Sequence, residues 1–197
     1  MCKAKREGKI FVISAPSGTG KSTVVKYIMK KNPYIKRSIS YTTRFPREDE
    51  VDKKDYFFIT PLEFKRKIKE GFFVEWAMVH GRYYGTSCSF INEVIKNGKK
   101  ALLVIDVQGA LQIRRKCPRN SILIFLLPPS LKELGKRLKK RGTETAKNFI
   151  QRLRTAKKEF HKIKYYDYLI VNDRIEGAAK EIKKILDSGG KIGKNNS

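Results

Sequence analysis

The sequence contains few cysteines, few histidines and no long apolar run. Its 197 residues include three cysteines and two histidines. The spacing of Cys2, Cys88 and Cys117 does not match a metal site, and an odd number of thiols cannot pair completely, so we expect free thiols in a reducing compartment such as the cytoplasm. The apolar run at 10–13 is too short for a signal peptide or a membrane span, and we expect neither.

Acidic residues are also scarce, because the chain has 19 Asp and Glu against 45 Lys and Arg, a formal net charge of +26. This charge fits polyanionic substrates, a non-specific affinity for nucleic acids or a compositional bias towards lysine. The lysines are spread along the chain without a dense block, so we expect a solvated surface and no dedicated nucleic-acid site. A nucleic-acid-binding surface would need aromatic rings among basic residues, and Arg82-Tyr83-Tyr84 is the single candidate.

The residues that are present favour one α/β domain. Hydrophobic residues make up 40% of the chain, which is enough for a core. Short apolar runs alternate with helix-compatible segments, and this alternation predicts a parallel sheet with helices on both faces. The predicted strands are 10–13, 101–105, 122–126 and 167–171, and the predicted helices are 22–31, 87–97, 107–116 and 174–186. We expect residues 188–197 to form a disordered tail.

The first predicted strand leads into a phosphate-binding loop. Residues 15–22, Ala-Pro-Ser-Gly-Thr-Gly-Lys-Ser, fit the pattern G-x-x-x-x-G-K-[ST] except that alanine stands first. Gly18 and Gly20 allow successive backbone N–H groups to surround anionic oxygens at a helix N-terminus. Lys21 can then reach the β- and γ-phosphates, and the Ser22 hydroxyl can bind Mg²⁺. The loop predicts a nucleoside-triphosphate site, and the alternative is an ordinary glycine-rich turn.

Two regions interrupt the alternation of strands and helices. Residues 38–59 mix hydroxyls, arginines and a proline without helical or strand periodicity, except for a short strand at 56–59. The following segments are a helix capped by Thr60 and ending at Gly71, a strand at 72–79, a turn or loop at 81–86, and two arginine-rich helices after residue 130 with a break at 142–145.

Seven motifs follow the phosphate loop. They are S-x-T-T-R-x-P-R at 40–47, DYFFI at 55–59, EWA at 75–77, HGRYYGTS at 80–87, IDVQGA at 105–110, RLKKRGTET at 137–145 and IVND at 170–173. With the loop, over residues 9–186, the chain resembles the guanylate kinases of the nucleoside-monophosphate kinase group. The resemblance implies a P-loop kinase of the α/β class, in which a central parallel sheet flanked by helices carries an inserted GMP-binding lobe and a helical lid. The implied boundaries are a core of about 8–36, 88–134 and 156–187, a lobe of about 37–87 and a lid of about 135–155.

The resemblance also implies the reaction and its residues. The reaction is Mg²⁺-dependent transfer of the γ-phosphoryl group of ATP to GMP and dGMP, in purine metabolism, by a monomer or homodimer. The implied GMP contacts are Ser40, Arg44, Arg47, Tyr56, Glu75, Tyr84, Thr86 and Asp106. The implied ATP contacts are Ala15, Pro16, Ser17, Gly18, Thr19, Gly20, Lys21, Ser22, Thr23, Asn172 and Asp173, with Ser22 as the metal ligand. The implied catalytic residues are Lys21, Arg44 and the lid residues Arg137, Arg141 and Arg152.

The chemistry of the residues agrees with these roles. A guanidinium group matches phosphate oxygens, and a carboxylate such as that of Glu75 can accept from both N1–H and the N2 amine of guanine. The alternatives are an edge position for Glu75 and a turn-forming role for Asn172 and Asp173. Because the acceptor phosphate has a second pKa of ~6, it is largely ionised and needs no general base. We therefore expect both histidines to be structural.

Three positions depart from the family pattern. Ala15 and Lys53 stand where glycine is usual, and Val104 stands where an acidic residue is frequent, which puts a second acidic contact to GMP in doubt. An alternative interpretation of the sequence is that the chain is a binding module, which has lost catalysis and holds phosphorylated peptides in the GMP cleft. Such modules lack the phosphate loop, whereas Lys21 and Ser22 are retained in this chain.

Overall fold

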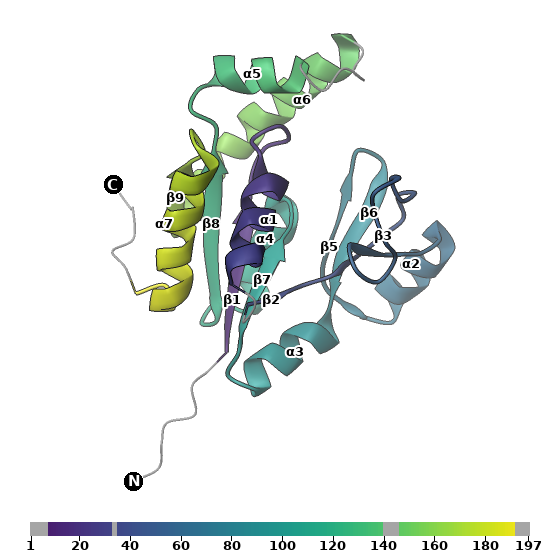
Figure 1. The fold of residues 1–197 in the computed structure, drawn as a ribbon. Coiled ribbons are helices and arrows are strands. Elements are labelled where there is room, and N and C mark those ends of the chain that lie inside the picture. Colours follow the sequence, from purple (N-terminus) through teal and green to yellow (C-terminus); the bar gives the residue numbers. More distant parts are fainter. Residues whose placement is uncertain (1–7, 33–34, 140–145, 192–197) are drawn as a thin grey trace.

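The computed structural model describes residues 8–32, 35–139 and 146–191, which form two sheets with helices around them (Figure 1). The first sheet is parallel, with the strand order β2-β7-β1-β8-β9, and the second has the order β4-β3-β6-β5. The strands are β1 (Lys9–Ser14), β2 (Lys36–Arg37), β3 (Ser40–Thr42), β4 (Tyr56–Phe58), β5 (Phe73–Val79), β6 (Arg82–Ser87), β7 (Lys100–Val104), β8 (Ser121–Leu127) and β9 (Tyr168–Val171).

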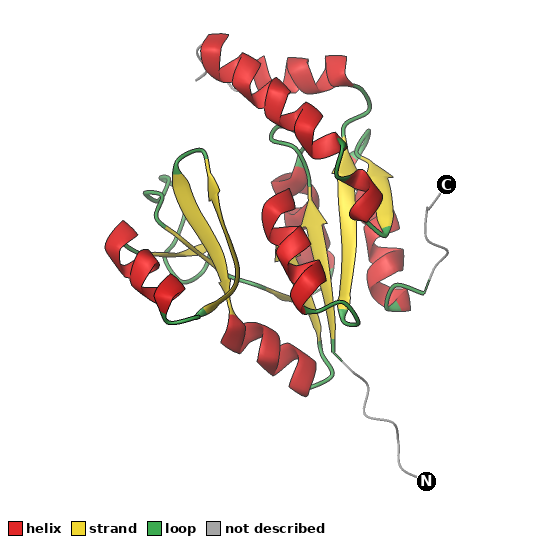
Figure 2. Cartoon of the chain, turned by 180° about the vertical axis from the view of Figure 1, so that it is seen from behind, coloured by secondary structure: helices red, strands yellow, loops and turns green. Residues whose placement is uncertain are grey.

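Helices cover both faces of the first sheet, as the alternation predicted (Figure 2). The helices are α1 (Lys21–Lys31), α2 (Pro61–Lys69), α3 (Cys88–Lys96), α4 (Val107–Lys116), α5 (Leu131–Lys139), α6 (Ala146–Phe160) and α7 (Ile175–Ser188). Successive side chains of β1 point to opposite faces. Phe11 and Ile13 pack in the cluster that contains residues of α1 and α7, whereas Ile10 and Val12 pack with residues of α3 and α4.

The second sheet stands beside the first and carries α2 (Figure 1). Helix α2 begins as predicted, since the Thr60 hydroxyl accepts from the Glu63 N–H at 3.2 Å and Pro61 is its first residue. Phe64 of α2 is fully buried and stacks on Phe73 at a ring distance of 4.4 Å. The second sheet therefore has an aromatic core of its own.

The prediction of a turn or loop at 81–86 is wrong, because these residues form most of β6, antiparallel to β5. The turn lies one residue earlier, where His80 and Gly81 both have positive φ, 49° and 75°, as in a type I′ hairpin. Gly85 also suggested a loop, but it lies inside the strand. A Cβ there would lie 2.9 Å from Phe73 Cδ1, so this glycine serves close packing.

Helices α5 and α6 lie above the carboxyl ends of the parallel strands (Figure 1). Leu134 and Leu138 of α5 are buried against Ala156 of α6, with Phe149 and Leu153 packed beside them. The predicted break at 142–145 lies outside the described residues.

Helix α7 extends to Ser188, which lies inside the segment expected to be disordered, and Gly189 ends the helix with a φ of 65°. The rest of that segment, from 192, lies outside the described residues. Among the residues that the structure describes, no helix is long and apolar enough to cross a membrane.

Candidate active site

The phosphate loop joins β1 to α1 with two glycines in the left-handed region. Gly18 has a φ of 88° and Gly20 a φ of 92°. No side chain caps the N-terminus of α1, so its backbone N–H groups are available to an anion. The loop is closed internally by a hydrogen bond from the Thr19 N–H to the Pro16 carbonyl at 3.2 Å. Successive backbone N–H groups in such a loop form a concavity that suits an anion.

Asn172, directly after β9, contacts the loop from the protein interior. Its side-chain nitrogen donates to the Thr19 carbonyl at 2.7 Å, and a Cβ on Gly20 would lie 2.6 Å from the same nitrogen. The backbone carbonyl of Asn172 accepts from Arg137 of α5 at 3.1 Å. Asn172 is buried and Asp173 is exposed. Asn172 thus fixes the loop and links it to α5.

The Lys21 side chain reaches across to the end of β7. Its ammonium group donates to the Ile105 carbonyl at 2.9 Å. Burial lowers the pKa of Lys21, while the carboxylates of Asp106 and Glu159 act in the opposite direction. In this position the ammonium group is held close to the loop by a single carbonyl and two nearby negative charges.

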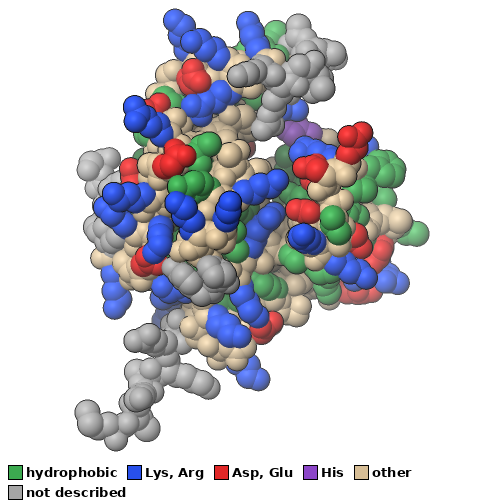
Figure 3. Space-filling view, in the orientation of Figure 1, with side chains coloured by type: hydrophobic (Ala, Val, Ile, Leu, Met, Phe, Trp, Pro, Cys, Tyr) green, Lys and Arg blue, Asp and Glu red, His purple; other side chains and the backbone are tan. Residues whose placement is uncertain are grey.

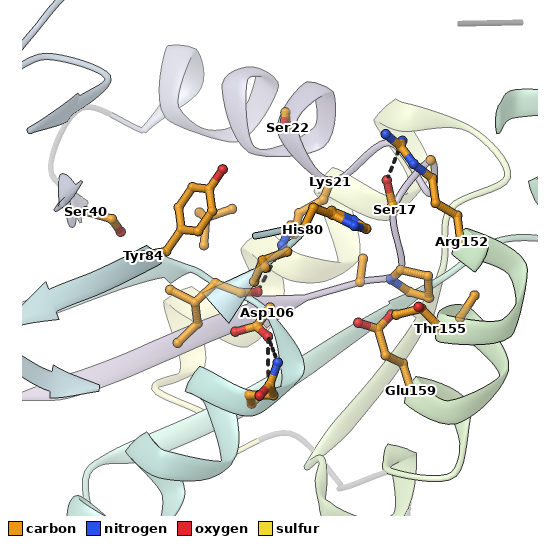
Figure 4. A pocket seen from close by; sticks show the side chains of 18 of the residues that line it. Ser17, Lys21, Ser22, Ser40, His80, Tyr84, Asp106, Arg152, Thr155 and Glu159 are labelled. Atoms are coloured by element: carbon orange, nitrogen blue, oxygen red, sulfur yellow. Dashed lines mark hydrogen bonds between the residues drawn. The ribbon is translucent and has the colours of Figure 1, made fainter. Parts of the chain in front are cut away.

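A cavity of about 640 Å³ extends from the phosphate loop to the second sheet (Figure 4). Of the predicted site residues, those that line it are Ala15, Pro16, Ser17, Gly18, Gly20, Lys21, Ser22, Thr23, Ser40, Arg47, Tyr56, Glu75, Tyr84, Asp106 and Arg152. Those that do not line it are Thr19, Arg44, Thr86, Arg137, Asn172 and Asp173. Arg141 lies outside the described residues. The structure therefore brings residues from both predicted sides, far apart in sequence, to one cavity.

Glu75 lines this cavity from β5 of the second sheet, yet it is only 2% exposed. A bulge between Phe73 and Glu75 shifts the register, so that Glu75 stands directly opposite Thr86 of β6. The Thr86 hydroxyl consequently donates to Glu75 Oε1 at 2.6 Å. Burial raises the pKa of Glu75 to about 7, although the bond from Thr86 favours the ionised form.

Asp106 lies between the two ends of the cavity and caps α4. Its carboxylate accepts from the backbone N–H groups of Gly109 at 3.1 Å and Gln108 at 3.3 Å. The Gln108 side chain adds a third bond to Asp106 Oδ2 at 3.2 Å. Figure 4 shows Asp106 close to Lys21. Both oxygens of Asp106 are therefore held by the start of α4.

The arginine and tyrosine residues predicted to bind phosphate lie on the second sheet and its connections. Tyr56 and Tyr84 meet edge to face with ring centroids 6.1 Å apart, and both line the cavity with Arg47. The Arg44 guanidinium lies 5.4 Å from the centre of the Tyr56 ring. It donates to Glu50 at 2.8 Å, which holds it outside the cavity lining.

One face of α6 lines the cavity beside the phosphate loop. Arg152, Thr155 and Glu159, spaced three and four residues apart, all line it, and Arg152 donates to the Ser17 hydroxyl at 3.2 Å (Figure 4). Burial raises the pKa of Glu159 to about 7, and Lys21 opposes this shift. Within the described part of the chain, Glu159 Oε2 is buried without a hydrogen-bond partner.

Sequence reasoning missed several of the lining residues. Glu159 and Thr155 share the helical face of Arg152, and this spacing was a usable signal. His80, expected to be structural, also lines the cavity from the turn between β5 and β6. Gln108 had no signal other than its place beside Asp106.

Together, a phosphate loop after the first strand of a parallel sheet and a second sheet across the cavity define a P-loop kinase. The guanylate kinase family model matches residues 7–189, and the chain belongs to the guanylate kinase family. The guanylate kinase of Caldanaerobacter subterraneus subsp. tengcongensis is 44% identical over 182 residues, which are 92% of this chain and 88% of that protein. That of Syntrophotalea carbinolica is 46% identical over 182 residues, or 92% and 86% of the two chains.

A solved structure supports the same assignment. The crystal structure of guanylate kinase from Anaplasma phagocytophilum matches with a TM-score of 0.79 and 34% identity, covering 95% of this chain and 88% of that chain. The predicted family, the α/β P-loop kinase fold and the activity of an ATP:GMP phosphotransferase are thereby confirmed.

Proposed function

We propose that the cavity between the two sheets is the phosphoryl-transfer site, with ATP at the phosphate loop and GMP at the second sheet. The observation that carries this proposal is that Lys21 and Glu75 line one cavity, of about 640 Å³, from opposite ends. An ammonium group beside a helix N-terminus suits a triphosphate. A buried carboxylate beside a hydroxyl suits a base that offers adjacent donors.

At the donor end, the loop N–H groups and Lys21 bind the phosphates of ATP. Lys21 leaves the Ile105 carbonyl and turns to the β- and γ-phosphates. Ser22, exposed in the first turn of α1, would hold Mg²⁺. A single protein hydroxyl would suffice there, because Mg²⁺ commonly binds through substrate phosphates and keeps several waters. When bound, Mg²⁺ neutralises developing charge on the phosphates.

At the acceptor end, Glu75 accepts from N1–H and the N2 amine of guanine. Thr86 orients Glu75, and Ser40 lies on the same side of the cavity. Arg47, Tyr56 and Tyr84 bind the phosphate of GMP. An oxygen of the ionised GMP phosphate then attacks the γ-phosphorus in line, the bond from that phosphorus to the β,γ-bridging oxygen breaks, and ADP leaves with the electron pair. Positioning and charge stabilisation are the sources of rate acceleration.

We assign movement to a GMP-binding lobe of about 37–87 and to the described parts of the lid, residues 135–139 and 146–155. Arg152 bonds Ser17 of the loop, and Arg137 is bonded to the residue that holds the loop. Both arginines therefore connect the helices α5 and α6 to the phosphate loop or to the residue that holds it. Arg44, released from Glu50, joins Arg47 on the acceptor phosphate. The chain accepts GMP and dGMP as free nucleotides in the cytoplasm, as a monomer or homodimer.

Release of ADP in a coupled assay with ATP and Mg²⁺ tests the proposal. GMP, IMP, AMP and UMP are compared as acceptors, and we expect rapid release with GMP alone. Lys21→Met should abolish turnover because the charge at the phosphates is lost, while calorimetry should still detect GMP binding. Well-folded protein that releases no ADP with any acceptor would favour a binding module. A near-normal rate for Lys21→Met would contradict the role of Lys21.

A further inference from the structure

Gly109 lies in the first turn of α4. At this residue the helix backbone comes close to the Glu75 carboxylate. A Cβ built on Gly109 would lie 2.4 Å from Glu75 Oε2 and 3.1 Å from Glu75 Cδ. Cβ atoms do not approach other atoms so closely, so alanine fits only if the carboxylate moves. The φ of Gly109 lies outside the left-handed region. Glycine is therefore needed for close approach and not for its backbone freedom.

The Glu75 carboxylate is also held on its other side, so a displacement breaks a hydrogen bond. Its other oxygen, Oε1, accepts from the buried Thr86 hydroxyl at 2.6 Å. A Cβ at 109 would also lie 3.2 Å from Ile105 Cδ1, so the added methyl group is crowded on that side as well. The carboxylate is held between a hydroxyl of β6 and the bare backbone of α4. A methyl group on one side must displace it or separate it from Thr86.

The same residue holds the second acidic side chain at this end. The Gly109 N–H donates to Asp106 Oδ1 at 3.1 Å. Alanine retains this N–H, so a substitution at 109 affects Glu75 and leaves the cap on Asp106 in place. This separation makes the position informative for experiment.

We propose that Gly109 is a positioning residue that sets the choice of base, by leaving room for the Glu75 carboxylate to lie against α4 and face the acceptor. The inference rests on the proposed role of Glu75 as the acceptor of the guanine donors. The N2 amine distinguishes GMP from IMP, which has only N1–H. A displaced carboxylate loses its contact with the N2 amine. The kcat/KM for GMP should therefore fall more than the kcat/KM for IMP.

The test compares kcat/KM for GMP and IMP in Gly109→Ala at saturating ATP. We expect the ratio of GMP to IMP to fall about 10- to 100-fold, the scale of one good bidentate contact to a base. The KM for ATP should not change. The matched control is Gly177→Ala in α7, where a Cβ would meet nothing within 4 Å, and the ratio should stay at the wild-type value.

A folded Gly109→Ala enzyme with the wild-type ratio would overturn the inference, as would equal losses with both acceptors. A wild-type enzyme that does not favour GMP over IMP would instead contradict the proposed role of Glu75. The two failures are therefore distinguishable.

A second variant covers the case in which Gly109→Ala does not fold. Glu75→Asp shortens the side chain by one methylene group, which makes room for the methyl group that alanine adds at 109. In that background Gly109→Ala should fold and cost little further selectivity. A further loss of GMP selectivity as large as about 10-fold in the Glu75→Asp background would contradict a role through Glu75.

Discussion

Glu75 is a nearly buried carboxylate, and its ionisation has a cost in the absence of nucleotide. Its pKa is raised from the ordinary value of 4.5 to about 7, chiefly by burial. Between these two values the folded protein binds more protons than the unfolded chain, so the free energy of unfolding falls as pH rises. The contribution of Glu75 is favourable below pH 4.5 and is lost through about pH 7.

Glu75→Gln should therefore stabilise the nucleotide-free protein at pH 8 by about 1–3 kcal/mol, and by nearly nothing at pH 4. The glutamine oxygen can still accept from Thr86, so the packing is retained. Urea unfolding at the two pH values measures the difference, with the exposed Glu181→Gln as the control. Equal stabilisation at both pH values would show that ionisation of Glu75 is not the cause.

His80 occupies a backbone conformation that suits asparagine better. It has a φ of 49° and precedes Gly81, with a φ of 75°, in the hairpin turn of β5 and β6. Asparagine followed by glycine is the preferred pair in such turns. His80→Asn should raise the free energy of unfolding by about 0.5–1 kcal/mol, measured by thermal unfolding. His161→Asn, outside the hairpin, should have little effect, and a destabilised His80→Asn would mean that the ring has a packing role.

At the scale of elements, the end of β9 controls the phosphate loop through Asn172. Its amide bond to the Thr19 carbonyl fixes the loop without lining the cavity. Asn172→Ala leaves that buried carbonyl without its partner, which should destabilise the loop conformation by about 1 kcal/mol. The KM for ATP should therefore rise about 5-fold while the KM for GMP changes little.

Steady-state kinetics of Asn172→Ala measure both constants. Asn92→Ala, on the exposed side of α3, is the control for the loss of an asparagine side chain. If the KM values for ATP and GMP rose together, Asn172 would act on the whole structure and not on the loop.

The elements that sequence could predict are those with local signals. The strand, loop and helix around Gly18 and Gly20 follow from an apolar run, small residues and the adjacent Lys21. Strand β6 was missed because Gly81 and Gly85 look alike in sequence, whereas one makes the turn and the other packs against Phe73. A packing contact between distant segments leaves no local signal.

The site was predictable to a similar extent. Glu75 was recognised because a carboxylate among apolar strand residues is unusual, but its contact with Gly109 spans 34 residues and has no sequence signature. Lys53 stands where the family usually has glycine. Its φ of 62° lies in the left-handed region, in which glycine carries no strain. For Val104 the structure adds that it lines the cavity beside Asp106.

At the scale of the whole molecule, the basic residues behind the formal net charge of +26 are spread along the sequence without a dense block. Figure 3 shows Lys and Arg side chains scattered over the visible face. The aromatic residues considered for nucleic-acid stacking are engaged elsewhere: Tyr83 stacks on Phe64 at a ring distance of 5.2 Å, and Tyr84 lines the cavity.

We propose that the two ends of one cavity select different nucleotides. Calorimetric titration of wild-type and Glu75→Gln protein with GMP and, separately, with ATP and Mg²⁺ tests it most directly. We predict that the Kd for GMP rises about 10- to 100-fold in the variant while the Kd for ATP is unchanged. An unchanged Kd for GMP, or an equal rise for both nucleotides, would contradict the account.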